Sequence, residues 1–238
     1  MSNKKFYTYL EFDYLKLNVA TFNKQNNKLE NYLEKPYNSL NENKELNFDQ
    51  IEKISEEIIY EVEKSTGEYV KDIFLMVETP LSKDFKLSIM KNNEGYKITK
   101  KDTLYLIQEA KQKFLKFNLD LAILHIIIEN YVLDGTNYDF LSFDKNCKKF
   151  SIDLKFICFP KDLVKNFEKL FLKQQIVINK FVCSNYVKSF NFDDKSNLKT
   201  NCEKGIKIVN GSNKREVVSV PKIIEKTGFF EKLFHLFD

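Results

Sequence analysis

The side chains that most often carry chemistry are sparse in this 238-residue chain, which has only two histidines, His125 and His235. Its four cysteines are Cys147, Cys158, Cys183 and Cys202. No two of them form a C-x-x-C pair, so the usual spacing of a zinc site is missing. We therefore predict no metal site and no catalytic residues, and we expect the cysteines to be buried, reduced thiols of a cytosolic protein.

Glycine and the basic residues bear on two further classes of function. The chain has six glycines, and because phosphate-binding loops need glycine for close backbone approach, we predict no nucleotide or other cofactor. The net charge is +4, and the basic residues, nearly all lysines, are spread along the chain. A nucleic-acid binder is therefore the weakest alternative, and we expect no nucleic-acid partner.

The last twelve residues, Thr227 to Asp238, suggest a different chemistry, which is partition into a lipid surface. On a helix, their apolar side chains recur at i, i+3, i+4 and i+7 and form one stripe. The predicted membrane-binding residues are Phe229, Phe230, Leu233, Phe234, Leu236 and Phe237. A short aromatic helix behind a polar tether is typical of an in-plane membrane anchor, and a helix docked on the protein's own core is the alternative. We predict that residues 223–238 form an amphipathic membrane-targeting helix.

The rest of the chain is predicted to be cytosolic. It has no apolar signal region at its N-terminus, and the longest apolar run, residues 121–128, is too short to span a bilayer. Together with the tail, this predicts a peripheral protein on the cytoplasmic face of a membrane.

The pattern of apolar residues divides the rest of the chain into two structural units. In the first, residues 6–22 alternate as a strand or strand pair, a helical face from Phe48 stops near Gly67, and residues 72–78 read as a strand buried on both faces. Strand, helix and buried strand predict an α/β layer.

The second unit begins at residue 83. Its predicted elements are a strand at 85–90, a helix from the capping box at Thr99 through Phe117, a long strand at 121–133, an alternating strand at 150–158 and a helix opened by Pro160. An apolar strand at 176–182 and a short helix at 184–190 come next. The polar stretch 191–222 predicts a flexible linker of low order before the tail.

The motifs in this order resemble those of FtsA, a family of bacterial cell-division actin homologues. Residues 123–134, I-L-H-I-I-I-E-N-Y-V-L-D, are similar to the FtsA segment V-L-H-V-I-P-Q-E-Y-x-I-D. Residues 137–143, N-Y-D-F-L-S-F, stand where that family has N-P-x-G-L-S-G, and residues 155–164 and the tail also look like FtsA segments. Taken alone, Leu124-His125 is more often core than site, because a strand histidine is usually a satisfied core residue.

The resemblance implies the fold and its division. It implies an incomplete actin-like (RNase H-like) first lobe made of residues 1–82 and 176–190. A strand-helix-strand-strand (SHS2-type) subdomain of α+β character at 83–175 would be inserted into it. The linker and the amphipathic helix would follow, and the second lobe of the family is expected to be absent.

The departures from the family concern the nucleotide. FtsA opens with G-L-E-I-G-T-x-K-V, whose Gly-Thr turn lets the chain approach phosphates. Here the stretch is Y-L-E-F-D-Y-L-K-L, with Asp13 and Tyr14 in place of that turn and Lys16 retained. A carboxylate about 4 Å from a phosphate costs several kcal/mol. The sequence therefore predicts that no nucleotide binds.

The leading hypothesis is a non-enzymatic, membrane-attached adaptor of the cell-division machinery. Its inserted subdomain would contact cell-division proteins, its tail would contact the inner-membrane lipid surface, and the chain could self-associate. A pilus or secretion assembly adaptor similar to PilM is an alternative, and an ATP-binding actin-like protein is another.

Overall fold

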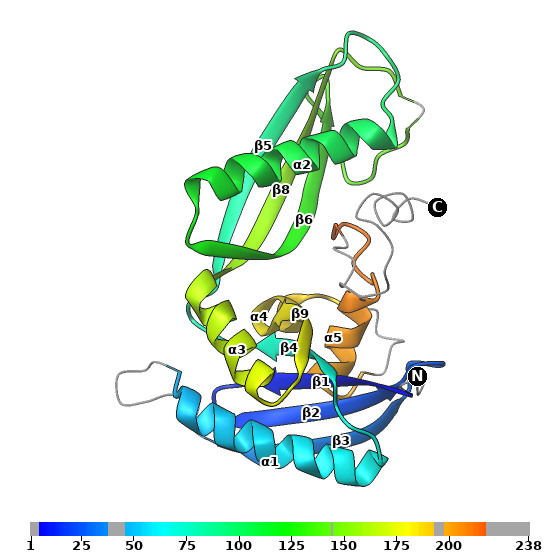
Figure 1. The fold of residues 1–238 in the computed structure, drawn as a ribbon. Coiled ribbons are helices and arrows are strands. Elements are labelled where there is room, and N and C mark those ends of the chain that lie inside the picture. Colours follow the sequence, from blue (N-terminus) through cyan, green and yellow to red (C-terminus); the bar gives the residue numbers. More distant parts are fainter. Residues whose placement is uncertain (1–4, 38–45, 144, 193–197, 218–238) are drawn as a thin grey trace.

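The computed structural model describes residues 5–37, 46–143, 145–192 and 198–217. They form two β-sheets, a five-stranded one and a four-stranded one, each covered by helices (Figure 1). No helix among these residues is both long and apolar enough to cross a membrane.

The larger sheet has the strand order β3-β2-β1-β4-β9. Its strands are β1 (Phe6–Phe12), β2 (Lys16–Asn23), β3 (Leu29–Pro36), β4 (Asp72–Val77) and β9 (Val177–Cys183). The first three are antiparallel neighbours, so the region predicted as a strand or strand pair is a pair. β4 runs parallel to β1, and β9 runs parallel to β4 with Val177 opposite Asp72. The chain thus returns to this sheet after a long excursion.

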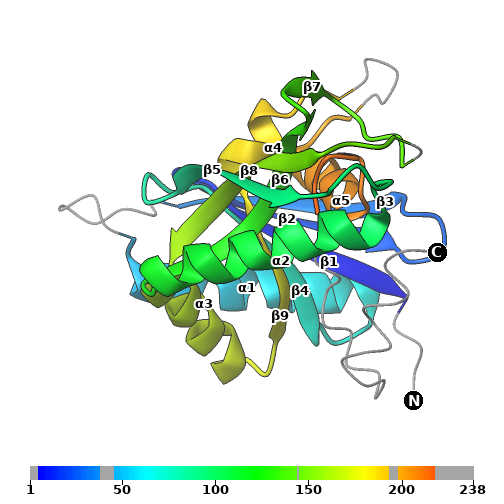
Figure 2. The ribbon, with the colours of Figure 1, turned by 90° about the horizontal axis from the view of Figure 1, so that it is seen from above.

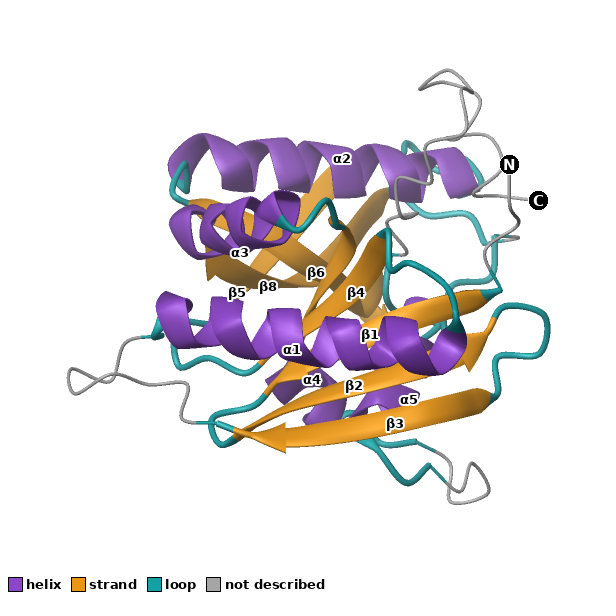
Figure 3. Ribbon diagram, turned by 60° about the horizontal axis from the view of Figure 1, so that its bottom comes forward, coloured by secondary structure: helices purple, strands orange, loops and turns teal. Residues whose placement is uncertain are grey.

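Helices cover both faces of the larger sheet (Figure 3). They are α1 (Phe48–Thr66) and α3 (Lys161–Lys173) on one face, and α4 (Ser184–Ser189) and α5 (Asn201–Val209) on the other. In α1 the Asn47 side chain caps the N-terminus by accepting from the Gln50 amide. The helix ends at Gly67, whose φ of 69° is left-handed and favours glycine, as the predicted stop required.

The smaller sheet is antiparallel and has the order β5-β8-β6-β7. Its strands are β5 (Lys83–Asn92), β6 (Leu121–Leu133), β7 (Thr136–Tyr138) and β8 (Lys149–Pro160). The helix α2 (Lys100–Phe117) lies across one face of it (Figures 1 and 2). The predicted capping box is present, since Thr99 and Asp102 each accept from the other's backbone amide. The Phe114 ring stacks on Phe156 at 4.8 Å and ties the helix to the sheet.

The structure differs from the predicted division in the placement of α3. The sequence grouped this helix with residues 83–175, but its apolar face packs into the core of the larger sheet. The Phe167 ring lies 5.4 Å from Phe12 and 5.1 Å from Phe48. The smaller sheet therefore ends with β8, at Pro160. An amphipathic pattern gives the apolar face of a helix but not the sheet that the face covers.

The predicted linker at 191–222 is wrong for the part of it that is described after residue 197. Residues 201–209 form α5, opened by a second capping box between Thr200 and Glu203. Cys202 and Ile206 are buried in the core of the larger sheet. Gly205 lies so close to Met76 that an added Cβ would meet the Met76 sulfur at 3.4 Å. A few apolar residues in a polar stretch are enough to dock a helix once it is capped.

Candidate functional site

The predicted membrane-binding residues lie outside the described part of the chain. They are Phe229, Phe230, Leu233, Phe234, Leu236 and Phe237. The last described residue is Val217, whose amide donates to the Ile126 carbonyl of β6 at 2.8 Å. The Ile128 amide donates to the Arg215 carbonyl, also at 2.8 Å, so residues 215–217 lie along the edge of β6. The described part of the chain therefore ends at the edge of the smaller sheet.

The turn between β1 and β2 stands where the sequence placed a lost phosphate loop. The Lys188 ammonium of α4 lies 2.7 Å from the Glu78 carboxylate and 3.5 Å from that of Asp13. Burial would lower the pKa of Lys188, but the Glu78 and Asp13 carboxylates overcome this and raise it. Lys16 pairs instead with Glu34 of β3 at 2.7 Å, on the surface. The turn is thus closed by the ion pairs that Lys188 of α4 makes with Asp13 of the turn and with Glu78, the residue after β4.

A buried carboxylate, that of Glu11, lies beside this turn. It accepts hydrogen bonds from Asn18 Nδ2 at 3.0 Å, Ser184 Oγ at 2.9 Å and Asn201 Nδ2 at 3.0 Å. Ser184 and Asn201 are the first residues of α4 and α5, whose N-termini favour negative charge. Glu11 therefore holds the two helices on the sheet, and its oxygens are engaged in doing so.

The chemistry open to this region is limited. Two carboxylates share a single lysine, so the three side chains carry one excess negative charge, which disfavours an anion such as phosphate. Within the described ranges, no cluster of three or more His, Cys, Asp or Glu side chains could hold a metal ion. The arrangement is suited to holding elements together rather than to binding phosphate.

A second polar cluster lies at the junction of the two sheets and includes His125 of β6. Its Nδ1 lies 2.8 Å from Glu216 Oε1, and its Nε2 accepts from the Cys183 amide at 3.0 Å. Tyr186 donates its hydroxyl to Glu216 Oε2 at 2.9 Å. Asn213 Nδ2 donates to that hydroxyl at 2.7 Å. His125 is a fully satisfied core histidine, as expected for a histidine in a strand.

These contacts fix the protons of the cluster. Because the Cys183 amide can only donate, His125 Nε2 carries no proton, and Nδ1 carries the one that it donates to Glu216. Burial lowers the pKa of His125 and keeps the ring neutral. Burial would raise the pKa of Glu216, but the hydrogen bond from His125 and the Lys180 ammonium at 3.6 Å lower it. Glu216 is thus a buried carboxylate with three partners.

Glu216 was missed by the sequence analysis because it lies in the predicted linker. The one available signal is the β-branched run that begins at Val217, which predicts an extended segment but no partner. His125 and Glu216 are separated by 91 positions, so no local spacing connects them.

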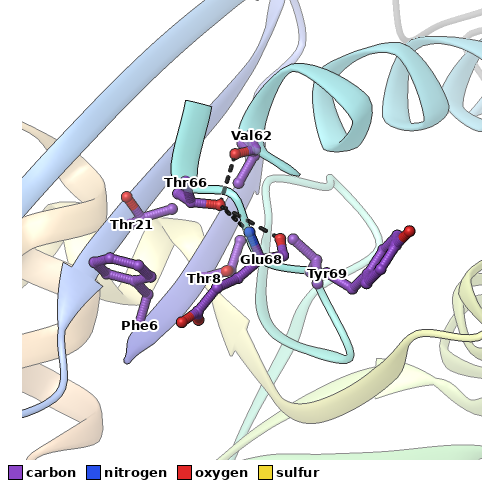
Figure 4. Close-up of a pocket in the computed structure, with 8 residues that line it drawn as sticks. Phe6, Thr8, Thr21, Val62, Thr66, Glu68 and Tyr69 are labelled. Atoms are coloured by element: carbon purple, nitrogen blue, oxygen red, sulfur yellow. Dashed lines mark hydrogen bonds between the residues drawn. The ribbon is translucent and has the colours of Figure 1, made fainter. Parts of the chain in front are cut away.

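A shallow pocket that is open to solvent lies where β1 and β2 meet the end of α1 (Figure 4). Its lining residues are Phe6, Thr8, Thr21, Val62, Thr66, Glu68, Tyr69 and Val70. The Thr66 hydroxyl donates to the Val62 carbonyl at 2.8 Å, as part of the helix end. The pocket encloses only about 10 Å³, about the space of one water molecule, which is far below the volume of ordinary cofactor pockets.

The strand order and directions define the class of the larger sheet. The sheet has three antiparallel strands followed by two parallel ones, in the order β3-β2-β1-β4-β9, and helices cover both of its faces. This is the arrangement of an α/β lobe of the actin-like, RNase H-like type. The four-stranded sheet with α2 is an α+β unit placed between β4 and β9. The predicted mixed α/β class with an inserted α+β unit is confirmed.

Comparison with known proteins gives similarity in structure only. The sequence matches no protein-family model and no curated protein. The chain is similar to a PilM-PilN type IV pilus biogenesis complex, with a TM-score of 0.46, 9% identity and 76% of this chain covered. It is also similar to the cytoplasmic domain of EpsL, an inner membrane component of the type II secretion system of Vibrio cholerae, with a TM-score of 0.36, 5% identity and 79% covered.

A third similar structure is a protein of unknown function with an actin-like ATPase fold from Bacteroides thetaiotaomicron, with a TM-score of 0.32, 10% identity and 78% of this chain covered. The chain spans 48%, 59% and 54% of the lengths of these three structures, in that order.

Proposed function

We propose that this chain is a non-enzymatic assembly adaptor with an actin-like lobe, held at the cytoplasmic face of the bacterial inner membrane by its C-terminal tail. The observation that carries the proposal is the closed β1–β2 turn. There Lys188 is engaged by Glu78 and Asp13, in the place where the related fold binds a phosphate. A lobe that keeps its sheet while filling this position is suited to contacts with other proteins.

The cell-division role rests on the FtsA-like motifs at residues 123–134 and 137–143 and on the FtsA-like tail. In this proposal the α+β unit, residues 83–160, contacts cell-division proteins, and self-association of the chain multiplies the membrane contacts. The pilus or secretion assembly adaptor is the second candidate. This second candidate is supported by the two similar structures that are described as parts of pilus and secretion systems, the PilM-PilN complex and the cytoplasmic domain of EpsL.

The experiment that tests the membrane attachment is flotation of the full chain with vesicles of anionic and zwitterionic phospholipids. The parent protein should float, and Phe234→Glu should stay in solution because a charge on the apolar stripe opposes insertion. The matched control is His235→Glu, which adds the same charge on the other side of the predicted helix and should still float. Equal flotation of the parent and Phe234→Glu would reject the membrane anchor.

The experiment that separates the two assembly roles is capture of partners, from the organism that encodes the chain, by the full protein and by the protein lacking residues 83–160. Cell-division proteins captured only by the full protein support the first role. Pilus or secretion components captured in the same way support the second.

A further inference from the structure

The buried cluster around His125 joins three parts of the chain that are distant in sequence. His125 belongs to β6 of the smaller sheet, whereas Cys183 ends β9 of the larger one. Glu216 comes from the segment after α5, the last to be described before the tail. The hydrogen bonds from His125 to Glu216 and from the Cys183 amide to His125 therefore hold that segment to both sheets at once.

We propose that this cluster is an acid-sensitive latch, which holds residues 213–217 against β6 when His125 is neutral and releases them when His125 gains a proton. The inference rests on the cluster alone and does not require the proposed membrane function.

The proton acts through the geometry of one hydrogen bond. Nε2 of His125 is an acceptor toward the Cys183 amide at 3.0 Å. A proton added there turns the acceptor into a donor and sets it against another donor, so the bond between the sheets is lost. With a proton on each nitrogen, the ring could find an acceptor for both only by leaving this position. The hydrogen bond between His125 Nδ1 and the Glu216 carboxylate would then break.

The charged and titratable groups around the ring act in both directions: burial and Lys180 lower the pKa of His125, Glu216 and Asp84 raise it, and the net effect is a lowered pKa. These groups are Glu216 from the C-terminal segment, Lys180 and Cys183 from β9, Tyr186 from α4 and Asp84 from β5. The Lys180 ammonium, 3.6 Å from Glu216, already balances the carboxylate, so a second positive charge on His125 would be in excess. Burial supports the neutral ring by lowering the pKa of His125.

The test is amide hydrogen exchange of the full chain at pH 7.5 and pH 5.5, corrected for the intrinsic rates. If the released state takes up a proton with the ordinary histidine pKa of about 6.5 and the latched state does not, protection of residues 213–217 should fall about tenfold over this range. The α1 amides, which lie away from the cluster, should keep their protection. In His125→Asn, which cannot titrate, the fall should disappear.

Three outcomes would overturn the latch. They are unchanged protection of residues 213–217 between the two pH values, the same fall in His125→Asn, or an equal fall in α1, which would place the effect on the whole fold. A second measurement needs no variant at position 125. Nitrogen NMR of the parent protein should show His125 protonated on Nδ1 and bare on Nε2 at pH 7.5, with His235→Ala identifying the signals of the other histidine. Protonated Nε2 at that pH would also reject the latch.

Discussion

The Lys188 ammonium lies 2.7 Å from the Glu78 carboxylate and joins the first residues after β4 to the helix that follows β9. With Asp13 on its other side, it closes the β1–β2 turn from within. The same lysine that could have attracted a phosphate is held by two carboxylates of the chain itself.

We therefore expect no binding of Mg-ATP at micromolar concentration. A phosphate at this turn would face the Asp13 and Glu78 carboxylates and would have to displace them from Lys188. Isothermal titration calorimetry of the full chain measures this directly. Micromolar affinity for Mg-ATP or Mg-ADP would contradict the closed turn and restore the ATP-binding alternative.

Replacing Lys188 should cost stability. Lys188→Met leaves Asp13 and Glu78, both partly buried, without their common cation, and should lower the free energy of unfolding by about 1 kcal/mol. Urea unfolding followed by circular dichroism gives this value. The control is Lys165→Met, whose partner Asp162 is exposed and 4.0 Å away, and whose change should stay within about 0.5 kcal/mol. Equal effects of the two variants would mean that the Lys188 pairs contribute nothing specific.

The position of α3 is tested through Phe167, which is fully buried between Phe12 and Phe48. Phe167→Ala should destabilise the protein by about 3–5 kcal/mol, because it leaves a cavity in the core of the larger sheet. Phe117→Ala, at a side chain that is 80% exposed, should cost less than about 0.5 kcal/mol. Thermal unfolding of both variants measures the difference. A small loss for Phe167→Ala would argue that α3 does not belong to that core.

The four cysteines should resist alkylation in the folded protein. All are buried, and burial raises the pKa of the Cys158 thiol to about 12 and that of Cys202 well above its usual range. After treatment with iodoacetamide at pH 8, mass spectrometry should show no modification without denaturant. In about 6 M guanidinium, it should show modification of all four cysteines. Rapid native labelling of Cys158 would show that β8 opens locally.

Vesicle binding should rise steeply with the density of the protein. The six apolar side chains predicted at residues 229–237 each contribute roughly 1–2 kcal/mol when partly buried, and ordering about ten residues costs on the order of 1 kcal/mol each. One tail therefore binds weakly, and several tails acting together bind firmly. A titration of protein against a fixed amount of vesicles measures this. A hyperbolic curve at low density would show that single tails suffice.

The local features of the fold could be predicted from the sequence because local chemistry sets them. The Thr99–Asp102 capping box, the stop at Gly67 and the strand at Leu121–Leu133 all stand where the sequence placed them. The capping box that opens α5 has the same Thr-x-x-acid pattern at Thr200, but the polar residues around it favoured a linker.

The candidate site depended on contacts that no local pattern encodes. His125 could be interpreted as a satisfied core residue, but its partner Glu216 lies 91 positions away. Likewise, the pairing of Lys188 with Asp13 and Glu78 arises only after β1, β4 and β9 are placed side by side. Long-range pairing of polar groups is a result of topology, and one sequence gives topology only through resemblance.

The parallel pairing of β4 with β9 has a consequence for the order of folding. Asp72 faces Val177, so the whole smaller sheet is synthesised between the two partners. Until β9 leaves the ribosome, the apolar strand β4 presents an unpaired edge, and contacts this distant in sequence form slowly. The nascent chain is therefore most prone to aggregate in the interval between completion of β4 and arrival of β9, and a chaperone that binds apolar strands would act in that interval.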